Sequence, residues 1–150
     1  MKKFPQGIMF HHFHDKKKHP PGQGSISKDD FYKIIKYIGK KNILGPEEFF
    51  ERLKNKRLKN HNTTLTFDDT LRCQYDIAIE VLEDLNIKAF FFAYTSVYDG
   101  ESDSMEVFRY FRLNFFENIN LFYKLYFENV DLDLKKFLKK IKNKYKLGRK

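Results

Sequence analysis

Short apolar runs and helical apolar stripes alternate along the N-terminal part of the chain. The runs predict β-strands near residues 7–12, 63–68 and 88–93, and the last run lacks polar–apolar alternation, which is typical of a strand covered on both faces. Between the runs, apolar residues at helical spacing predict helices, the first of which carries Phe31, Ile34, Ile35 and Ile38 on its apolar face. This order of elements implies right-handed crossovers and a parallel sheet.

Polar residues mark where the predicted helices begin and end. Ser27 precedes a helix with acidic residues in its first turn, and Gly39 ends that helix. Pro46 opens a second helix, and a third is expected over residues 73–85. The turn-rich stretch 15–25 predicts a loop between the first strand and the first helix.

The C-terminal part is predicted to be helical and ends in a basic segment. Helices are expected over residues 105–113, 119–130 and 132–145. Residues 131–150 hold nine Lys or Arg and two Asp, a net charge of +7, out of +9 for the whole chain. We therefore expect an α/β region over residues 1–130 and a separate Lys-rich C-terminal helix over residues 131–150.

Size and composition narrow the class of protein. The 150 residues, 41% of them hydrophobic and 33% charged, suit one folded domain. No apolar run approaches the roughly 18–20 residues of a membrane helix, and the basic start lacks the apolar stretch of a signal peptide, so we expect a cytoplasmic protein. Cys73 is the only cysteine, which excludes an internal disulfide and a Cys-rich zinc site. The near-neutral body argues against a nucleic-acid partner.

Two adjacent carboxylates follow the second predicted strand, at the sheet edge where ligands bind in parallel sheets. Asp68 and Asp69 repel each other there unless a metal or a proton lies between them. Because side chains alternate along a strand, we expect different roles, one acid ligating a metal and the other taking a proton from water. A solvated turn, or Asp69 as N-cap of the next helix, is the alternative.

Histidines end the first predicted strand. If that strand is parallel to the second, His11 and His12, with His14 close by, lie at the same sheet edge as the two acids. Imidazole together with carboxylate suits Zn, Fe, Co or Mn. The alternative is a polar strand exit with solvated or hydrogen-bonded histidines. His19 and His61 are expected in loops without a ligand role.

Four segments, in the right order, resemble one family. Thr-Phe-Asp-Asp at 66–69, closing a buried strand, resembles the first motif of the polysaccharide deacetylases, the NodB-homology family of carbohydrate esterases. Met-Phe-His at 9–11 is similar to the end of that family's opening strand, and Ser-Ile-Ser-Lys-Asp-Asp-Phe at 25–31 to the start of its first helix. Ile-Lys-Ala-Phe-Phe-Phe-Ala at 87–93 is similar to a later strand. The resemblance implies a partial, distorted (β/α) barrel with a helical C-terminal extension.

The resemblance also implies an activity. It makes Asp68 the catalytic base and Asp69 a ligand of a divalent metal of the Zn, Co or Ni type. A metal-bound water would attack the N-acetyl carbonyl of an amino sugar, within an N-acetylated sugar or polysaccharide. The region 1–130 would then be an incomplete deacetylase-like unit, equivalent to the N-terminal half of the family and completed by a downstream chain.

The sequence departs from the family pattern at two points. Thr70 stands where the family usually has Gly, and no histidine follows His61, whereas the family supplies two metal histidines from a later His-x-x-x-His motif. We therefore expect a weak metal site formed by Asp69 with one or more of His11, His12 and His14.

Two other interpretations stay open. Phe-Asp-Asp-Thr-Leu at 67–71 also resembles the haloacid dehalogenase-type phosphatases, but their nucleophilic Asp falls on Thr66, which cannot form an aspartyl-phosphate. The chain is alternatively a non-catalytic fragment or binding module, whose basic helix contacts a polyanion such as acidic lipid, nucleic acid or a polyanionic sugar. The contacting residues would include Lys135, Lys136, Lys139 and Lys140. A solvated helix face is the plain alternative for these lysines.

Overall fold

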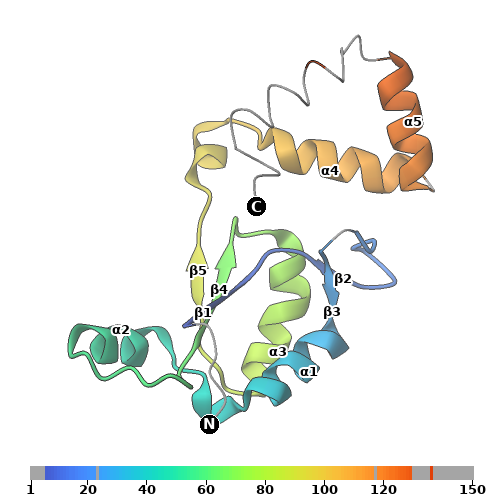
Figure 1. Cartoon of the computed structure of the whole chain (residues 1–150). Coiled ribbons are helices and arrows are strands. Elements are labelled where there is room, and N and C mark those ends of the chain that lie inside the picture. Colours follow the sequence, from blue (N-terminus) through green and yellow to red (C-terminus); the bar gives the residue numbers. More distant parts are fainter. Residues whose placement is uncertain (1–5, 23, 117, 130–135, 137–150) are drawn as a thin grey trace. The chain divides into compact units, whose positions relative to one another are not determined.

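The computed structural model describes residues 6–22, 24–116, 118–129 and Lys136 (Figure 1). The chain divides into two compact units, Met1–Ser104 and Met105–Lys150.

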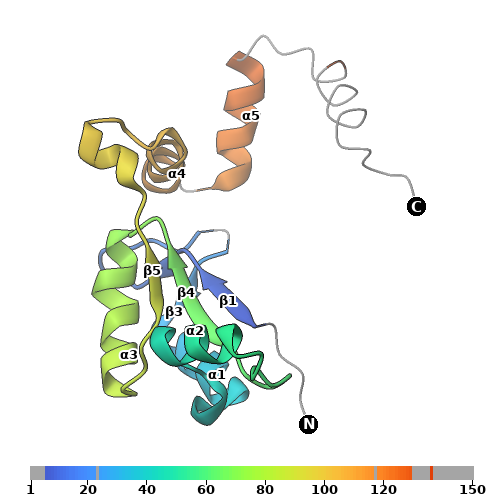
Figure 2. The same cartoon turned by 90° about the vertical axis from the view of Figure 1, so that its left-hand side faces the viewer.

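A three-stranded parallel sheet forms the centre of the first unit (Figure 2). Its strands are β1 (Gly7–Phe10), β4 (Thr64–Asp68) and β5 (Phe90–Phe92), in the order β1-β4-β5. In the register of the sheet, Phe10 pairs with Phe67 and Asp68 pairs with Phe92. The parallel sheet predicted from the three apolar runs is therefore confirmed, with strands shorter than the runs.

Helices cover both faces of this sheet. They are α1 (Lys28–Ile38), α2 (Pro46–Lys54) and α3 (Ile79–Asp84), with 3-10 turns at Lys40–Asn42 and Thr95–Asp99. As predicted, the Ser27 side chain caps α1 by accepting from the Asp30 amide, and Gly39 ends it with a φ of 84°. The helix predicted over 73–85 has a π-helical first part, Gln74–Ala78, which leads into α3.

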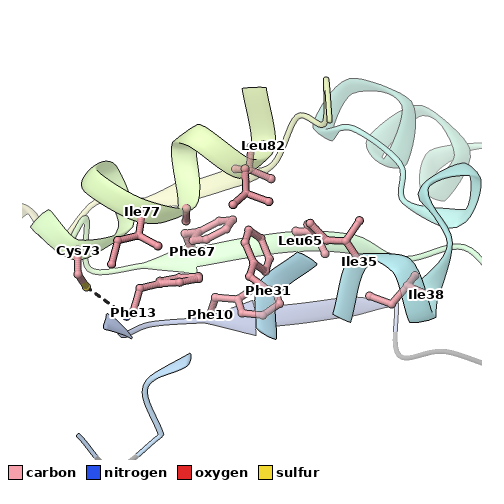
Figure 3. Close-up of a cluster of buried hydrophobic side chains, with 12 residues drawn as sticks. Phe10, Phe13, Phe31, Ile35, Ile38, Leu65, Phe67, Cys73, Ile77 and Leu82 are labelled. Atoms are coloured by element: carbon pink, nitrogen blue, oxygen red, sulfur yellow. Dashed lines mark hydrogen bonds between the residues drawn. The ribbon is translucent and has the colours of Figure 1, made fainter. Parts of the chain in front are cut away.

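The core lies between the sheet and the helices α1 and α3. Phe31 of α1 and Phe67 of β4 are fully buried, and their rings pack edge to face with centroids 6.0 Å apart (Figure 3). Because side chains alternate along a strand, Thr66 and Asp68 face the opposite side of the sheet. On that side Phe49 of α2 packs edge to face against Phe90.

Two details of the first unit differ from the sequence predictions. A second, two-stranded parallel sheet joins β2 (Phe13–His14) to β3 (Ile26–Ser27) and closes the loop expected over residues 15–25. The expectation that the run 88–93 is covered on both faces is wrong, because Phe91 and Phe92 are 40% and 54% exposed. β5 lies at an edge of the described sheet, so that part of its apolar surface is open.

The described part of the second unit contains the helices α4 (Ser104–Phe115) and α5 (Ile119–Asn129), close to the ranges expected from the sequence. Phe122 is 4% exposed and packs edge to face against Phe108 and Phe116. Among the helices of the described residues, none combines the length and the hydropathy that a transmembrane segment requires.

The third helix expected in this unit, over residues 132–145, lies outside the described residues except for Lys136, which is exposed. Lys135, Lys139 and Lys140 lie outside them as well. The expected division of the chain into residues 1–130 and 131–150 stays a prediction.

Candidate functional site

The end of β4 turns sharply at the two acids. Asp69 and Thr70 both have left-handed backbones, with φ of 71° and 51°, a conformation that a β-branched residue rarely adopts. The Asp69 amide donates to the carbonyl of Phe92 over 3.0 Å, which ties the turn to β5. Such backbone strain is found preferentially at functional sites.

His11 lies beside both acids. Its Nε2 is 3.8 Å from Oδ2 of Asp68 and 3.6 Å from Oδ2 of Asp69. These separations allow electrostatic attraction but exceed hydrogen-bond length. The three side chains are about one third exposed, so a solute can reach them. The prediction that the ends of the first two strands bring His11 and Asp69 together is confirmed.

The alternation of side chains assumed from the sequence does not extend to Asp69. β4 ends at Asp68, and the left-handed backbone that follows turns the Asp69 carboxylate toward the same imidazole. Both carboxylates therefore lie near the same nitrogen of His11, and one ligand could contact both.

The other two candidate histidines have different surroundings. The ring of His12 stacks against that of His11, with centroids 6.4 Å apart and planes 13° from parallel. Nδ1 of His14 lies 2.9 Å from Oγ of Ser25, which in turn donates to the carbonyl of Gly22. His14 thus helps to close the β2–β3 connection. A ligand role for His12 or His14 stays a prediction.

The donors at this edge are chemically suited to a divalent cation, because imidazole and carboxylate are ligands for Zn and Co. Among the described residues, however, no three His, Cys, Asp or Glu side chains are arranged as a ready-made metal site. Binding would require the side chains of His11, Asp68 and Asp69 to adjust.

A second polar cluster was not expected from the sequence. Nε2 of His19 lies 3.0 Å from one oxygen of Asp76, and Nε of Arg72 donates to the other over 2.9 Å. Arg72, and then His19, lower the pKa of the Asp76 carboxyl. This cluster fastens the loop after β2 to the helix after β4. Asp76 follows His19 by 57 residues, so no local sequence pattern could pair the two.

The same loop is closed by Asp15. One oxygen of its carboxylate accepts the backbone N–H groups of Lys17, Lys18 and His19 at 2.7–3.0 Å. These bonds, that of His19 first, lower the pKa of Asp15 to about 2.

Gln74 also contacts the site and was not singled out by sequence reasoning. It is 1% exposed, and its Nε2 donates to the carbonyls of His11 and Asp68 over 2.9 and 2.6 Å. Gln74 lies at helical spacing from the buried Ile77, Ala78 and Val81, and this place of a polar residue on the apolar face is the sequence signal that could have found it.

Comparisons with known proteins bear on the fold. No protein-family model and no curated protein matches the sequence. The structure is similar to that of a de-N-acetylase from Aggregatibacter actinomycetemcomitans, with a TM-score of 0.50 and 17% sequence identity. The match covers 63% of this chain and 39% of the de-N-acetylase, so the chain spans about two fifths of that protein. The chain therefore has a mixed α/β, deacetylase-like fold with a parallel sheet.

Proposed function

We propose that this chain is a deacetylase-like hydrolase that removes an N-acetyl group from an amino sugar. The observation that carries the proposal is the meeting of His11, Asp68 and Asp69 at the carboxyl ends of two parallel strands. The similarity of fold to a de-N-acetylase supports it. The same proposal includes that the first unit is a partial (β/α) barrel of the polysaccharide deacetylase family.

The roles of the residues follow from their chemistry. Asp68, one third exposed, is the general base that takes a proton from the attacking water. Asp69 and His11 would hold a divalent cation of the Zn, Co or Ni type, with His12 and His14 as further candidates. When bound, such a cation polarises the acetyl carbonyl.

We expect this site to be weak. The chain has no histidine after His61, so every imidazole available to it precedes the Asp68–Asp69 turn. We therefore expect poor affinity for the metal and little or no deacetylase activity from residues 1–150 alone, so that the proposed reaction needs the further polypeptide that completes the site.

The open side of the sheet supports a further part of the proposal. Met9 and Phe92, on the face opposite to α1 and α3, are 58% and 54% exposed. Apolar strand surface of this kind is normally covered. We propose that further polypeptide covers it and completes the barrel.

Calorimetry with Zn, Co and Ni on the wild type and on Asp69→Ala tests the metal site. Binding by the wild type should weaken strongly or vanish in Asp69→Ala and persist in Asp99→Ala, a matched change at an exposed acid. Identical titrations for wild type and Asp69→Ala would remove Asp69 from the site.

Release of acetate from N-acetylated oligosaccharides tests the reaction. Any metal-dependent rate should disappear in Asp68→Asn. A robust rate that depends on Asp68 would show that the chain carries a complete site without the family's later histidines. A rate that survives Asp68→Asn would remove this residue as the base.

A second candidate function is a binding module without catalysis, favoured by the net charge of +7 on residues 131–150. In this function the Lys-rich segment contacts a polyanion, and the first unit serves as its scaffold.

A further inference from the structure

The parallel pairing of β1 and β4 stops just before the candidate site. Its last pair is Phe10 with Phe67, so the next pair in register would be His11 with Asp68. The side chains of both residues belong to the candidate site. Their backbone carbonyls accept hydrogen bonds from the same atom, Nε2 of Gln74, over 2.9 and 2.6 Å. The amide of Gln74 thus joins the two strands at the point where their own ladder ends.

The chemistry of a primary amide suits this task. Nε2 carries two N–H groups, and each is used by one of the two carbonyls. An ammonium group would introduce a buried charge, and a hydroxyl group offers only one proton. Two carbonyl partners also fix which end of the amide faces the strands, because the oxygen cannot donate.

The buried oxygen of the same side chain argues against simple packing. Oε1 of Gln74 has no hydrogen-bond partner among the described residues, although the side chain is fully buried. A buried acceptor without a partner destabilises the folded state, so an apolar residue would serve better if packing were the only demand. The two hydrogen bonds that Nε2 donates offset the free-energy cost of this unpaired oxygen.

The helix that carries Gln74 is shaped around the histidine segment. Gln74 begins the π-helical part of the helix, and such π segments are frequent at functional sites. Its neighbour Cys73 accepts the N–H of Phe13 at its sulfur over 3.4 Å (Figure 3). Consecutive side chains of one helical turn therefore hold the chain on both sides of His12.

We propose that Gln74 is the positioning residue of the His11–Asp68–Asp69 cluster. By bridging the two carbonyls, it holds the strand ends at the spacing that brings the imidazole within reach of both carboxylates. It touches no reacting atom itself. This proposal rests on the proposed function at one point, because the proposed function identifies the His11–Asp68–Asp69 cluster as the functional site.

Two replacements of Gln74 separate the bridge from packing. Gln74→Met keeps the length and removes both N–H groups, and Gln74→Glu keeps the shape but sets an oxygen against two carbonyls. Gln6→Met is the matched control at an exposed glutamine, and Ile77→Val is a core control expected to lower the melting temperature without touching the bridge.

The first readout is the affinity of the whole 150-residue chain for Co and Zn by calorimetry. Outer contacts that orient ligands typically contribute about 10- to 100-fold to metal affinity, so Gln74→Met should lose that factor and Gln74→Glu at least as much. Gln6→Met and Ile77→Val should keep wild-type affinity.

The second readout is amide hydrogen exchange, which needs no metal. In Gln74→Met the amides of Phe13 and Asp69 should exchange about tenfold faster than in the wild type, while those of Leu65 and Phe67 follow global stability alone. A uniform increase over all four amides, or no change at Phe13 and Asp69, would overturn the positioning role.

The two readouts distinguish the proposals. If the wild type binds neither metal, the metal part of the proposed function fails, and exchange alone decides the role of Gln74. If the wild type binds metal and Gln74→Met binds it equally well, the positioning role is wrong even though the metal site stands.

Discussion

The imidazole of His11 lies 3.6 Å from the carboxylate of Asp69, and both residues come directly after the last residue of a strand. The parallel register of β1 and β4 brings the two strand ends together. Register alone does not suffice, because Asp69 reaches the imidazole only through its left-handed backbone. The candidate site is therefore built by one sheet and one strained turn.

The turn leads to a first prediction, for Thr70→Gly. Thr70 is exposed, β-branched and left-handed at φ 51°, a conformation that glycine adopts without a steric penalty. Relief of the strain should exceed the entropy that glycine adds to the unfolded chain, and we expect a net gain of about 0.5–1 kcal/mol. Thermal and urea unfolding measure this gain.

Lys56→Gly is the matched control, because Lys56 is also exposed and left-handed, at φ 55°, but is not β-branched and lies away from the site. It should gain less than Thr70→Gly. If Thr70→Gly unfolds at a lower temperature than the wild type, the Thr70 side chain makes a stabilising interaction that outweighs the strain.

Much of the first unit could be predicted from the sequence, because its apolar spacing has a direct physical cause. Helical spacing ending at Ile38, with a cap at Ser27 and a stop at Gly39, identifies α1. The short strands β2 and β3 could not be predicted, because two residues carry no periodicity. The exposure of Phe92 depends on what packs against β5, which spacing along one strand does not encode.

The site was predictable in part for the same reason. Parallel strands and their ends place the backbones of His11 and Asp69 at one sheet edge, but the left-handed turn that brings the Asp69 carboxylate to the imidazole has no signal in the apolar spacing. The positions of His14 and His19 depend on side-chain bonds with Ser25 and Asp76, which are distant in sequence. Gln74 acts through backbone carbonyls, and these are the same at every position of a sequence.

A second prediction concerns the aromatic core. The ring of Phe67 is fully buried and stacks on Phe91, with centroids 4.7 Å apart, besides contacting Phe10, Phe13 and Phe31. Phe67→Ala should therefore lower the free energy of unfolding by about 3–5 kcal/mol. Phe50→Ala, at a side chain that is 65% exposed, should change it by less than about 1 kcal/mol. Equal effects of the two changes in urea unfolding would contradict this core.

A third prediction follows from Asp15. Because three backbone N–H groups hold its pKa at about 2, below its ordinary 3.8, the ionised carboxylate stabilises the folded state above pH 3.8. That contribution is lost as the pH falls from 3.8 toward 2. Asp15→Asn should melt at a lower temperature than the wild type at pH 7, and the difference should shrink as the solution is acidified through this range.

Circular dichroism melts at several pH values measure the effect, with Asp99→Asn as a control at an exposed acid. The control should show a smaller difference from the wild type at pH 7. A difference for Asp15→Asn that stays constant down to pH 2 would mean that the three bonds do not depend on the charge of the carboxylate.

The last prediction concerns the basic segment, residues 131–150, whose net charge is +7. If it binds a polyanion, retention on heparin should fall steeply with salt, because each neutralised anionic group releases counterions. Deleting the segment should abolish retention and leave the melting temperature of the remaining chain unchanged.

Replacing Lys135, Lys136, Lys139 and Lys140 by Gln should weaken retention in proportion to the charge removed. The same replacement at the exposed lysines 16–18 should have little effect. Retention that survives the deletion would place the anion-binding surface on the first unit or on α4 and α5, where Arg109, Arg112 and Lys124 would be the next residues to replace.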